Sequence, residues 1–178
     1  MLKVILFLGY SGSGKTRSVV HLAEALINSG ATVGTIKSVH EPNFAIDTKG
    51  KDSWLHANAG SSIVEIVAVR ELVLIRKQNT KKLSLEYLLL PFKEAGVDYV
   101  LVEGLYRRVS RRSGILKIIC ASSEQEASIL LKEHGPAICI IGRTACKFAR
   151  ELEGVPVFKL PRDTKKILAL VKSKSALS

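Results

Sequence analysis

The chain has 178 residues, of which 47% are hydrophobic and 24% are charged, and its formal net charge at pH 7 is +11. This length suits one domain of ordinary size with its own core. No apolar run reaches about eighteen residues, so we expect neither a transmembrane helix nor a membrane partner. Lys3 interrupts the first apolar run and glycines follow it, so we expect no signal peptide and a cytoplasmic location.

The excess of basic residues is compatible with three kinds of partner: nucleic acid, an acidic protein, or a phosphorylated small molecule. Aromatic residues make up only 6% of the chain, and the sequence shows no platform on which bases could stack. We therefore do not expect nucleic acid as the main ligand.

Three cysteines occur, at Cys120, Cys139 and Cys146. They lack the Cys-x-x-Cys spacing of redox and zinc motifs, and two of them lie in apolar runs typical of strands. We predict that they are small core residues without a chemical role.

A glycine-rich motif follows the first apolar run. Residues 9–16 read Gly-Tyr-Ser-Gly-Ser-Gly-Lys-Thr, which matches the Walker A pattern G-x-x-x-x-G-K-[ST] at every fixed position. The run Leu2–Leu8 predicts a buried strand before the motif, and the apolar spacing after it predicts a helix to about Asn28. A strand, a glycine loop and a helix in this order are the context of a phosphate-binding loop.

In such a loop the backbone N–H groups and the helix N-terminus face phosphate oxygens. Lys15 would reach the β- and γ-phosphates, and the hydroxyl of Thr16 would bind Mg²⁺. The residues predicted to bind nucleotide are Gly9, Ser11, Gly12, Ser13, Gly14, Lys15, Thr16 and Arg17.

The next segment combines a strand, a polar loop and a β-rich stretch. A strand is predicted at Thr32–Lys37, a short helix at Trp54–Ala59 and two strands at Ile63–Val67 and Leu72–Ile75. In P-loop proteins the loop after the second strand lies across the phosphates. Asp52, in that loop, is either the N-cap of the short helix or a residue facing the metal, and both roles are compatible.

A second carboxylate ends a later apolar strand. A helix is expected over Leu83–Ala95, with a kink or break at Pro91. The strand that follows ends in Glu103-Gly104, the arrangement of a Walker B motif. Glu103 would lie beside the phosphate loop and hold Mg²⁺ or polarise a water.

The last third of the chain is more basic. Tyr106–Arg112, with four arginines, is expected to be a loop, either solvated or a contact surface for phosphate or an acidic partner. Strands are predicted at Ile115–Cys120, Ala137–Ile141 and Val155–Leu160, and helices from Ser123 to His134, over Thr144–Leu152 and from Asp163 to Val171.

The alternation of strands and helices predicts an α/β fold. We expect a three-layer α/β/α P-loop NTPase fold with a mainly parallel sheet and a β-rich insertion after Gly60. Residues 1–172 are predicted to form a single nucleotide-binding domain, with residues 173–178 as a frayed tail.

Several segments together resemble the MobB family of molybdenum-cofactor biosynthesis. They are the Walker A motif, Gly34–His40, Asp47, Gly50–Ser53 with Ala59-Gly60, and Val100–Gly104. The resemblance implies a homodimeric GTP-binding accessory protein with weak GTPase activity. It would assist a MobA-like guanylyltransferase that attaches GMP to molybdopterin, forming molybdopterin guanine dinucleotide.

Carried over by position, the resemblance makes Thr16, Asp52 and Glu103 the Mg²⁺ residues, with Asp52 similar to a metal-facing aspartate of dethiobiotin synthetase. The chain departs from the family pattern at Ser38 and Glu41, where histidines are usual, and at Arg17, where threonine is common. It also has no clear [NT]-K-x-D motif for reading guanine, so the resemblance alone implies guanine.

Three functions follow from these motifs. The first is a Mg²⁺-dependent GTP-binding protein with slow hydrolysis, in which Lys15 and Glu103 are the catalytic residues. The second is a small-molecule kinase or ATP-dependent ligase on the same fold, with Arg107–Arg112 binding the acceptor. The third is a nucleotide-gated scaffold whose basic surface docks an acidic protein.

Overall fold

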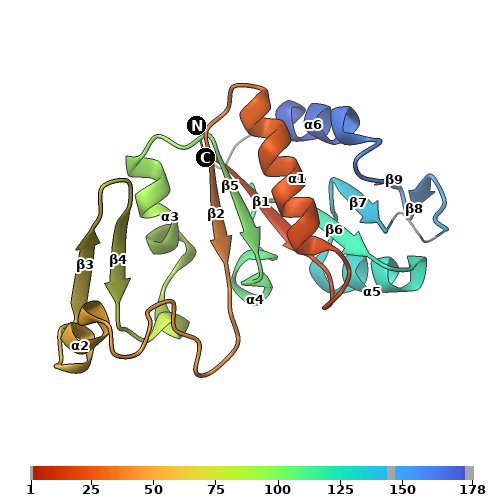
Figure 1. Ribbon diagram of the computed structural model, residues 1–178. Helices are drawn as coiled ribbons and strands as arrows, with labels where there is room; N and C mark the ends of the chain where they lie inside the picture. The colour runs from red at the N-terminus through yellow and green to blue at the C-terminus, as the bar shows by residue number, and fades with distance from the viewer. Residues whose placement is uncertain (1, 144–146, 175–178) are drawn as a thin grey trace. The chain divides into compact units, whose positions relative to one another are not determined.

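The computed structural model describes residues 2–143 and 147–174 (Figure 1). Their contacts divide the chain into two compact units, one of Met1–Ser38 with Leu85–Ser178 and the other of Val39–Ser84. None of the helices in the described part of the chain combines the length and apolar character of a membrane span. The single domain over residues 1–172 stays a prediction.

A seven-stranded sheet forms the larger unit, in the order β2-β5-β1-β6-β7-β9-β8. Every neighbouring pair is parallel except β8 with β9. The strands are β1 at Lys3–Leu8, β2 at Val33–Lys37, β5 at Tyr99–Glu103, β6 at Leu116–Ala121, β7 at Cys139–Gly142, β8 at Glu151–Leu152 and β9 at Val155–Phe158. The predicted mainly parallel sheet is confirmed.

Helices cover both faces of this sheet. On one face Ile5 and Phe7 pack against α1 (Lys15–Asn28) and α6 (Thr164–Ser173). On the other face the alternate residues of β1 pack against α3 (Leu85–Glu94), α4 (Tyr106–Val109) and α5 (Glu124–His134). Strands buried on both faces read as continuous apolar runs, which is why β1 and β5 are predictable from sequence. The larger unit is therefore the expected three-layer α/β/α architecture.

The smaller unit contains the predicted β-rich insertion. It consists of α2 (Asp52–Asn58), the antiparallel strands β3 (Ile63–Val67) and β4 (Leu72–Arg76), and a 3₁₀ turn at Thr80–Lys82. In this hairpin Val64 pairs with Ile75 and Ile66 with Val73, and these four side chains are buried or half-buried. The opposite face of the hairpin is also apolar but exposed: it carries Ile63, Val67, Leu72 and Leu74.

The helix expected over Thr144–Leu152 is wrong in its described part. Residues 147–150 are not helical, and Glu151–Leu152 form β8, which pairs with β9. Glu153 and Gly154 both have positive φ angles, of 50° and 76°, so they form a two-residue turn that joins the two strands. Residues 144–146 of the expected helix, Cys146 included, lie outside the described residues.

Three smaller expectations also differ from the structure. The loop expected at Tyr106–Arg112 begins with the short helix α4, which buried Val109 anchors in the core. Helix α3 continues through Pro91 to Glu94, with Leu89 before the proline and Phe92 after it packed against the core, so of the expected kink or break the break is wrong and the kink stays a prediction. Lys51, not Asp52, occupies the N-cap of α2.

The frayed tail predicted over residues 173–178 starts inside α6, which ends at Ser173. Lys172 and Ser173 still belong to α6, whose last carbonyls are capped from β1. The ammonium of Lys3 donates hydrogen bonds to the carbonyls of Val171 and Lys172, at 3.2 and 2.8 Å. Residues 175–178 lie outside the described residues.

Candidate functional site

The phosphate loop connects the end of β1 to the start of α1. Two of its glycines are required by geometry. A Cβ on Gly9 would lie 2.3 Å from the carbonyl oxygen of Cys120 and 2.5 Å from Oγ of Ser13. Gly14 is the N-cap of α1 and has a φ of 91°, in the left-handed region that favours glycine. The loop can therefore run close to β6 and turn directly into the helix, with its backbone amides at the helix N-terminus.

Lys15 begins helix α1 and folds back over this loop. Its Nζ donates a hydrogen bond of 2.8 Å to the carbonyl of Tyr10. Across the loop Glu126 of α5 accepts hydrogen bonds from the backbone N–H of Ser122, at 2.7 Å, and of Tyr10, at 3.5 Å. The loop is thus held by one cationic and one anionic side chain from two different helices.

Thr16 and Glu103 lie within hydrogen-bond distance of each other. The Thr16 hydroxyl donates to the Glu103 carboxylate, with both oxygens at 3.0 Å. Strand order explains this proximity, because β5 is the direct neighbour of β1 and Glu103 is in register with Phe7, just before the loop. The structure brings together two residues, far apart in the sequence, that are both predicted to hold Mg²⁺.

Glu103 is a buried carboxylate with a cationic partner. The residue is only 6% exposed, and it forms an ion pair with Lys37, the last residue of β2. Lys37 and Glu103 are in register on the adjacent strands β2 and β5. A buried charge is costly unless it is paired, so Lys37 stabilises the ionised carboxylate beside the phosphate loop.

The predicted third metal residue, Asp52, lies in the smaller unit. It is an exposed residue in the first turn of α2, where its negative charge interacts favourably with the helix dipole. Nearby, Asp47 accepts hydrogen bonds from the Ser53 hydroxyl, at 2.8 Å, and from the N–H of Thr48. These contacts order the loop before α2, and the role of Asp52 toward a metal stays a prediction.

The other predicted nucleotide-binding residues all belong to the loop or to the first turn of α1. Ser11, Gly12 and Arg17 are exposed, whereas Ser13 is 2% exposed. Within the described residues, Oγ of Ser13 is buried and has no hydrogen-bond partner. A buried hydroxyl without a partner costs free energy, and a bound ligand or water could supply the missing hydrogen bond.

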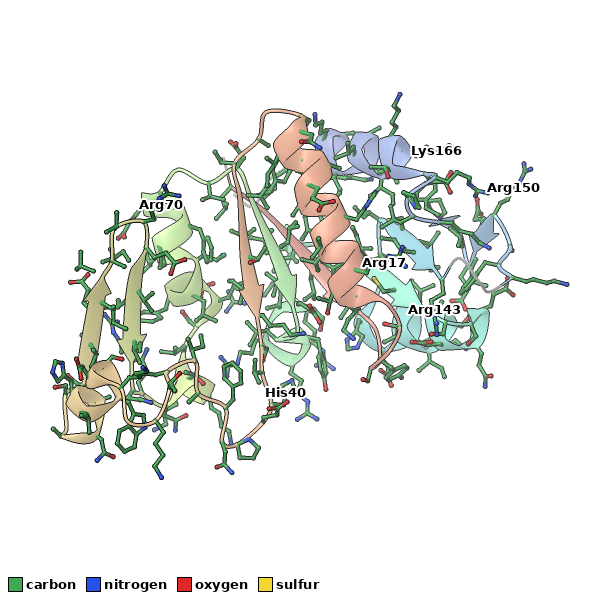
Figure 2. The ribbon with its side chains drawn as sticks, viewed as in Figure 1. Arg17, His40, Arg70, Arg143, Arg150 and Lys166 are labelled. Carbon is green, nitrogen blue, oxygen red and sulfur yellow. The ribbon has the colours of Figure 1, made fainter. Side chains whose placement is uncertain are left out.

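A cavity of about 330 Å³ adjoins the loop on the side of β7 and β9. The residues that line it include Gly12, Ser13, Arg17, Ile141, Arg143 and Leu160. It falls within the range of about 300–1,000 Å³ that is typical of small-molecule sites. In Figure 2, Arg17 lies at the start of α1 and Arg143 lies just beyond β7.

Cys120 lies beneath the loop but has no features of a reactive thiol. It is fully buried in the middle of the sheet, and burial raises its pKa to about 12. Cys139, on the neighbouring strand, is equally buried, and burial raises its pKa as well. Both thiols stay protonated at neutral pH, so the prediction of core cysteines is confirmed for these two residues.

Sequence reasoning missed Lys37, Glu126 and Arg143 as members of this region. A signal existed for Lys37 and Arg143, because each stands at the carboxyl end of a parallel strand, the edge where α/β proteins bind ligands. The sequence places Glu126 only within the helix predicted from Ser123 to His134. Its side chain does continue to the phosphate loop, and no local pattern predicts that contact.

Residues 4–142 match the family described as "Molybdopterin guanine dinucleotide synthesis protein B", MobB. A molybdopterin-guanine dinucleotide biosynthesis adapter protein of Haemophilus influenzae is 45% identical over 96 residues, which are 54% of this chain and 53% of that protein. A putative adapter protein of the same pathway from Methanocaldococcus jannaschii is 29% identical over 133 residues, or 75% of this chain and 53% of that protein. The chain thus spans about half the length of these curated relatives.

Solved structures show the same fold. MobB of Bacillus subtilis superposes with a TM-score of 0.75 at 22% identity, covering 97% of this chain and 99% of that chain. The hydrogenase maturation factor HypB of Archaeoglobus fulgidus gives a TM-score of 0.51 at 12% identity, covering 97% and 89%. Since the family match extends over most of the chain, from the first strand to the end of β7, the chain belongs to the MobB family.

Proposed function

We propose that the chain is a Mg²⁺-dependent GTP-binding adapter that acts in the synthesis of molybdopterin guanine dinucleotide. The observation that carries the proposal is the Thr16–Glu103 contact beside a complete phosphate loop. The names of the relatives supply the pathway, since two of them are described as adapter proteins of molybdopterin-guanine dinucleotide biosynthesis. A cytoplasmic location stays an expectation from the sequence.

The residues present suit a triphosphate with Mg²⁺. Mg²⁺ prefers oxygen ligands and is usually held by one or two carboxylates together with substrate phosphates. The Thr16 hydroxyl and the Glu103 carboxylate offer such oxygens, and Asp52 is proposed as a further one. When bound, the metal would neutralise charge on the phosphates. The loop amides and Lys15 would hold the phosphate oxygens from the other side.

Lys37 pairs with the carboxylate that we propose as the metal ligand. Its ammonium neutralises Glu103, although 56% of the Lys37 side chain is exposed. The exposed ammonium can therefore leave the carboxylate at little cost when a divalent cation approaches. In this proposal Glu103 would hold the divalent cation in place of the Lys37 ammonium, and Lys37 would then be free to meet a phosphate oxygen. Hydrolysis, supported by Lys15 and Glu103, is proposed to be slow.

A basic surface next to the site suits an acidic protein partner. Helix α4 follows Glu103-Gly104 directly and carries the exposed residues Arg107 and, just after the helix, Arg111. We propose a MobA-like guanylyltransferase as that partner, with molybdopterin as its substrate. A pull-down of such an enzyme should weaken as salt rises, because exposed charges are screened.

The same arginines favour one alternative, a small-molecule kinase or ATP-dependent ligase in which they bind an anionic acceptor. A nucleotide screen distinguishes the two functions. Preference for ATP with phosphoryl transfer to an added acceptor would support the alternative. GTP binding without an acceptor reaction supports the adapter.

The smaller unit is proposed to form a homodimer contact. The exposed face of its hairpin carries Ile63, Val67, Leu72 and Leu74, which are 47–79% exposed. An isolated two-stranded hairpin is marginally stable in water, and an exposed apolar face of this kind marks an interaction site. A second copy of the chain can cover this face with the same residues, as an isologous interface requires.

Substitution of Lys15 tests the nucleotide site. We expect K15A to lose thermal stabilisation by GTP with Mg²⁺, because Lys15 is the one basic residue in the loop of residues 9–16 and its ammonium folds back over that loop. K132A is a matched control, since Lys132 is an exposed lysine of α5 without a contact to the loop. The measurement is the shift in melting temperature with saturating nucleotide. Equal shifts for K15A and the wild-type chain would contradict the assignment.

A further inference from the structure

The cavity beside the phosphate loop is lined by two arginines, Arg17 and Arg143. Within residues 2–143 and 147–174, neither Arg17 nor Arg143 forms a side-chain hydrogen bond or an ion pair. The backbone of Arg143 is nevertheless fixed, because its N–H donates to the carbonyl of Ala121 at 3.1 Å. Two unpaired cations in one cavity of a P-loop unit indicate a site for an electron-rich ligand.

The residues that line the cavity are of two kinds. One kind belongs to the loop: Gly12, Gly14 and Ser13, whose buried hydroxyl has no hydrogen-bond partner among the described residues. The other kind is apolar: Ile141 in β7, which is 5% exposed, and half-buried Leu160, two residues after β9. A nucleotide has the same polarity, with a charged phosphate chain at one end and a flat apolar base at the other. Phosphates in the loop would therefore leave the base between Ile141 and Leu160, within reach of Arg143.

The base edges of guanine and adenine present different groups to such an arginine. Guanine offers two acceptors, O6 and N7, which the planar fork of a guanidinium can bind together. Adenine offers the acceptor N7 beside the N6 amino group, which is a donor, and arginine has no acceptor to meet it. We propose that Arg143 selects guanine over adenine through a bidentate contact to O6 and N7. This contact would supply the guanine recognition for which the chain has no [NT]-K-x-D motif.

Arg17 has a different role in this arrangement. It lies two residues after Lys15, in the first turn of α1, on the phosphate side of the cavity. From there its guanidinium binds the phosphate chain or the ribose, which GTP and ATP share. Arg17 therefore strengthens the binding of both nucleotides equally, whereas Arg143 strengthens the binding of GTP over that of ATP.

The inference rests on the proposed nucleotide binding, and calorimetric titrations with GTP and with ATP, each with Mg²⁺, test it. R143Q should weaken GTP binding by roughly tenfold to a hundredfold, as expected for loss of a bidentate base contact. The same variant should bind ATP as well as the wild-type chain or better, because a glutamine amide pairs with N6 and N7 of adenine. R143K keeps the charge and also has donors only, so it should keep part of the preference for GTP while losing the affinity that the planar fork adds.

Two further variants complete the design. R17Q should weaken GTP and ATP by the same factor. R150Q is the matched control, because Arg150 is an exposed arginine beyond the cavity lining, and it should behave as the wild-type chain (Figure 2). Unchanged GTP preference in R143Q overturns the role of Arg143 and leaves the proposed function standing. A wild-type chain that binds neither nucleotide overturns the proposed function and this inference with it.

Discussion

Glu103 combines three properties that are rarely found together in a structural residue. It is buried, it ends a central strand, and its carboxylate contacts both the hydroxyl of Thr16 and the ammonium of Lys37. Within the protein the ammonium of Lys37 pairs with this charge. The position of Glu103 beside the phosphate loop also supports its proposed role toward a divalent cation.

Replacing Glu103 by glutamine tests this explanation. E103Q keeps the volume of the side chain and its hydrogen bond to Thr16 but removes the negative charge. We expect Mg²⁺ to enhance GTP affinity about tenfold less in E103Q than in the wild-type chain, while affinity without Mg²⁺ changes little. The measurement is the dissociation constant for GTP with Mg²⁺ and with EDTA. The same Mg²⁺ enhancement in both proteins would show that Glu103 does not serve the metal.

At the scale of single residues, the sequence predicts the site wherever a local motif carries the geometry. Lys15, Thr16 and Glu103 follow from a glycine loop and a strand end, and both features are local patterns. Lys37 and Arg143 do not follow, because their roles depend on which strands are neighbours and on the register between them. Those relations arise from long-range pairing, which no short pattern encodes.

Helix α3 and strand β2 meet at a contact that requires a glycine. A Cβ on Gly34 would lie 2.3 Å from the ring of Phe92. We expect G34A to lower the free energy of unfolding by about 1–3 kcal/mol, because the ring must move out of a packed position. Urea denaturation measures this change.

A double substitution is the control for this contact. In an F92A background the ring is absent, so adding G34A should cost much less than it does alone. Equal costs in the two backgrounds would mean that another feature of β2 excludes a side chain at this position.

A helix or strand can be predicted from the sequence when its own residues carry the pattern, and cannot when distant contacts decide its structure. The strands β1 and β5 are predictable because burial on both faces leaves a continuous apolar run. The segment before β9 is not, since its basic and apolar spacing fits a helix while the turn at Glu153-Gly154 pairs Leu152 with Val155 instead. Helix α4 likewise depends on a tertiary contact, the burial of Val109.

The two compact units differ in how completely they bury apolar residues. The larger unit has a core on each face of its sheet. The hairpin of the smaller unit leaves one apolar face exposed. This asymmetry supports the proposed association through the smaller unit.

A charged substitution on the hairpin tests this association. We expect L74E to turn a dimer into a monomer, because Leu74 is at the middle of the exposed face, opposite Glu65, and a second glutamate would be buried there. V20E is the control, since Val20 is 52% exposed on α1 of the other unit. Light scattering after gel filtration gives the mass. A dimeric L74E, or a monomeric wild-type chain, would exclude the hairpin as the dimer contact.

For the whole molecule, the sequence predicts the α/β/α architecture but not the division of the chain into two compact units. The order of strands and helices around a Walker A motif identifies the α/β/α fold, and the motif set indicates the family. The separation of Val39–Ser84 as a compact unit of its own depends on contacts between residues far apart in sequence. Polar stretches lie at both boundaries, but loops within a single domain have the same composition, so no linker marks them.

We propose above all that the phosphate loop and Glu103 together bind a nucleoside triphosphate with Mg²⁺. Calorimetric titration of the wild-type chain with GTP, with and without Mg²⁺, tests it most directly. The account predicts saturable heats that fit one dissociation constant and binding that is tighter when Mg²⁺ is present. A flat trace for GTP and for ATP in the presence of Mg²⁺ would contradict it.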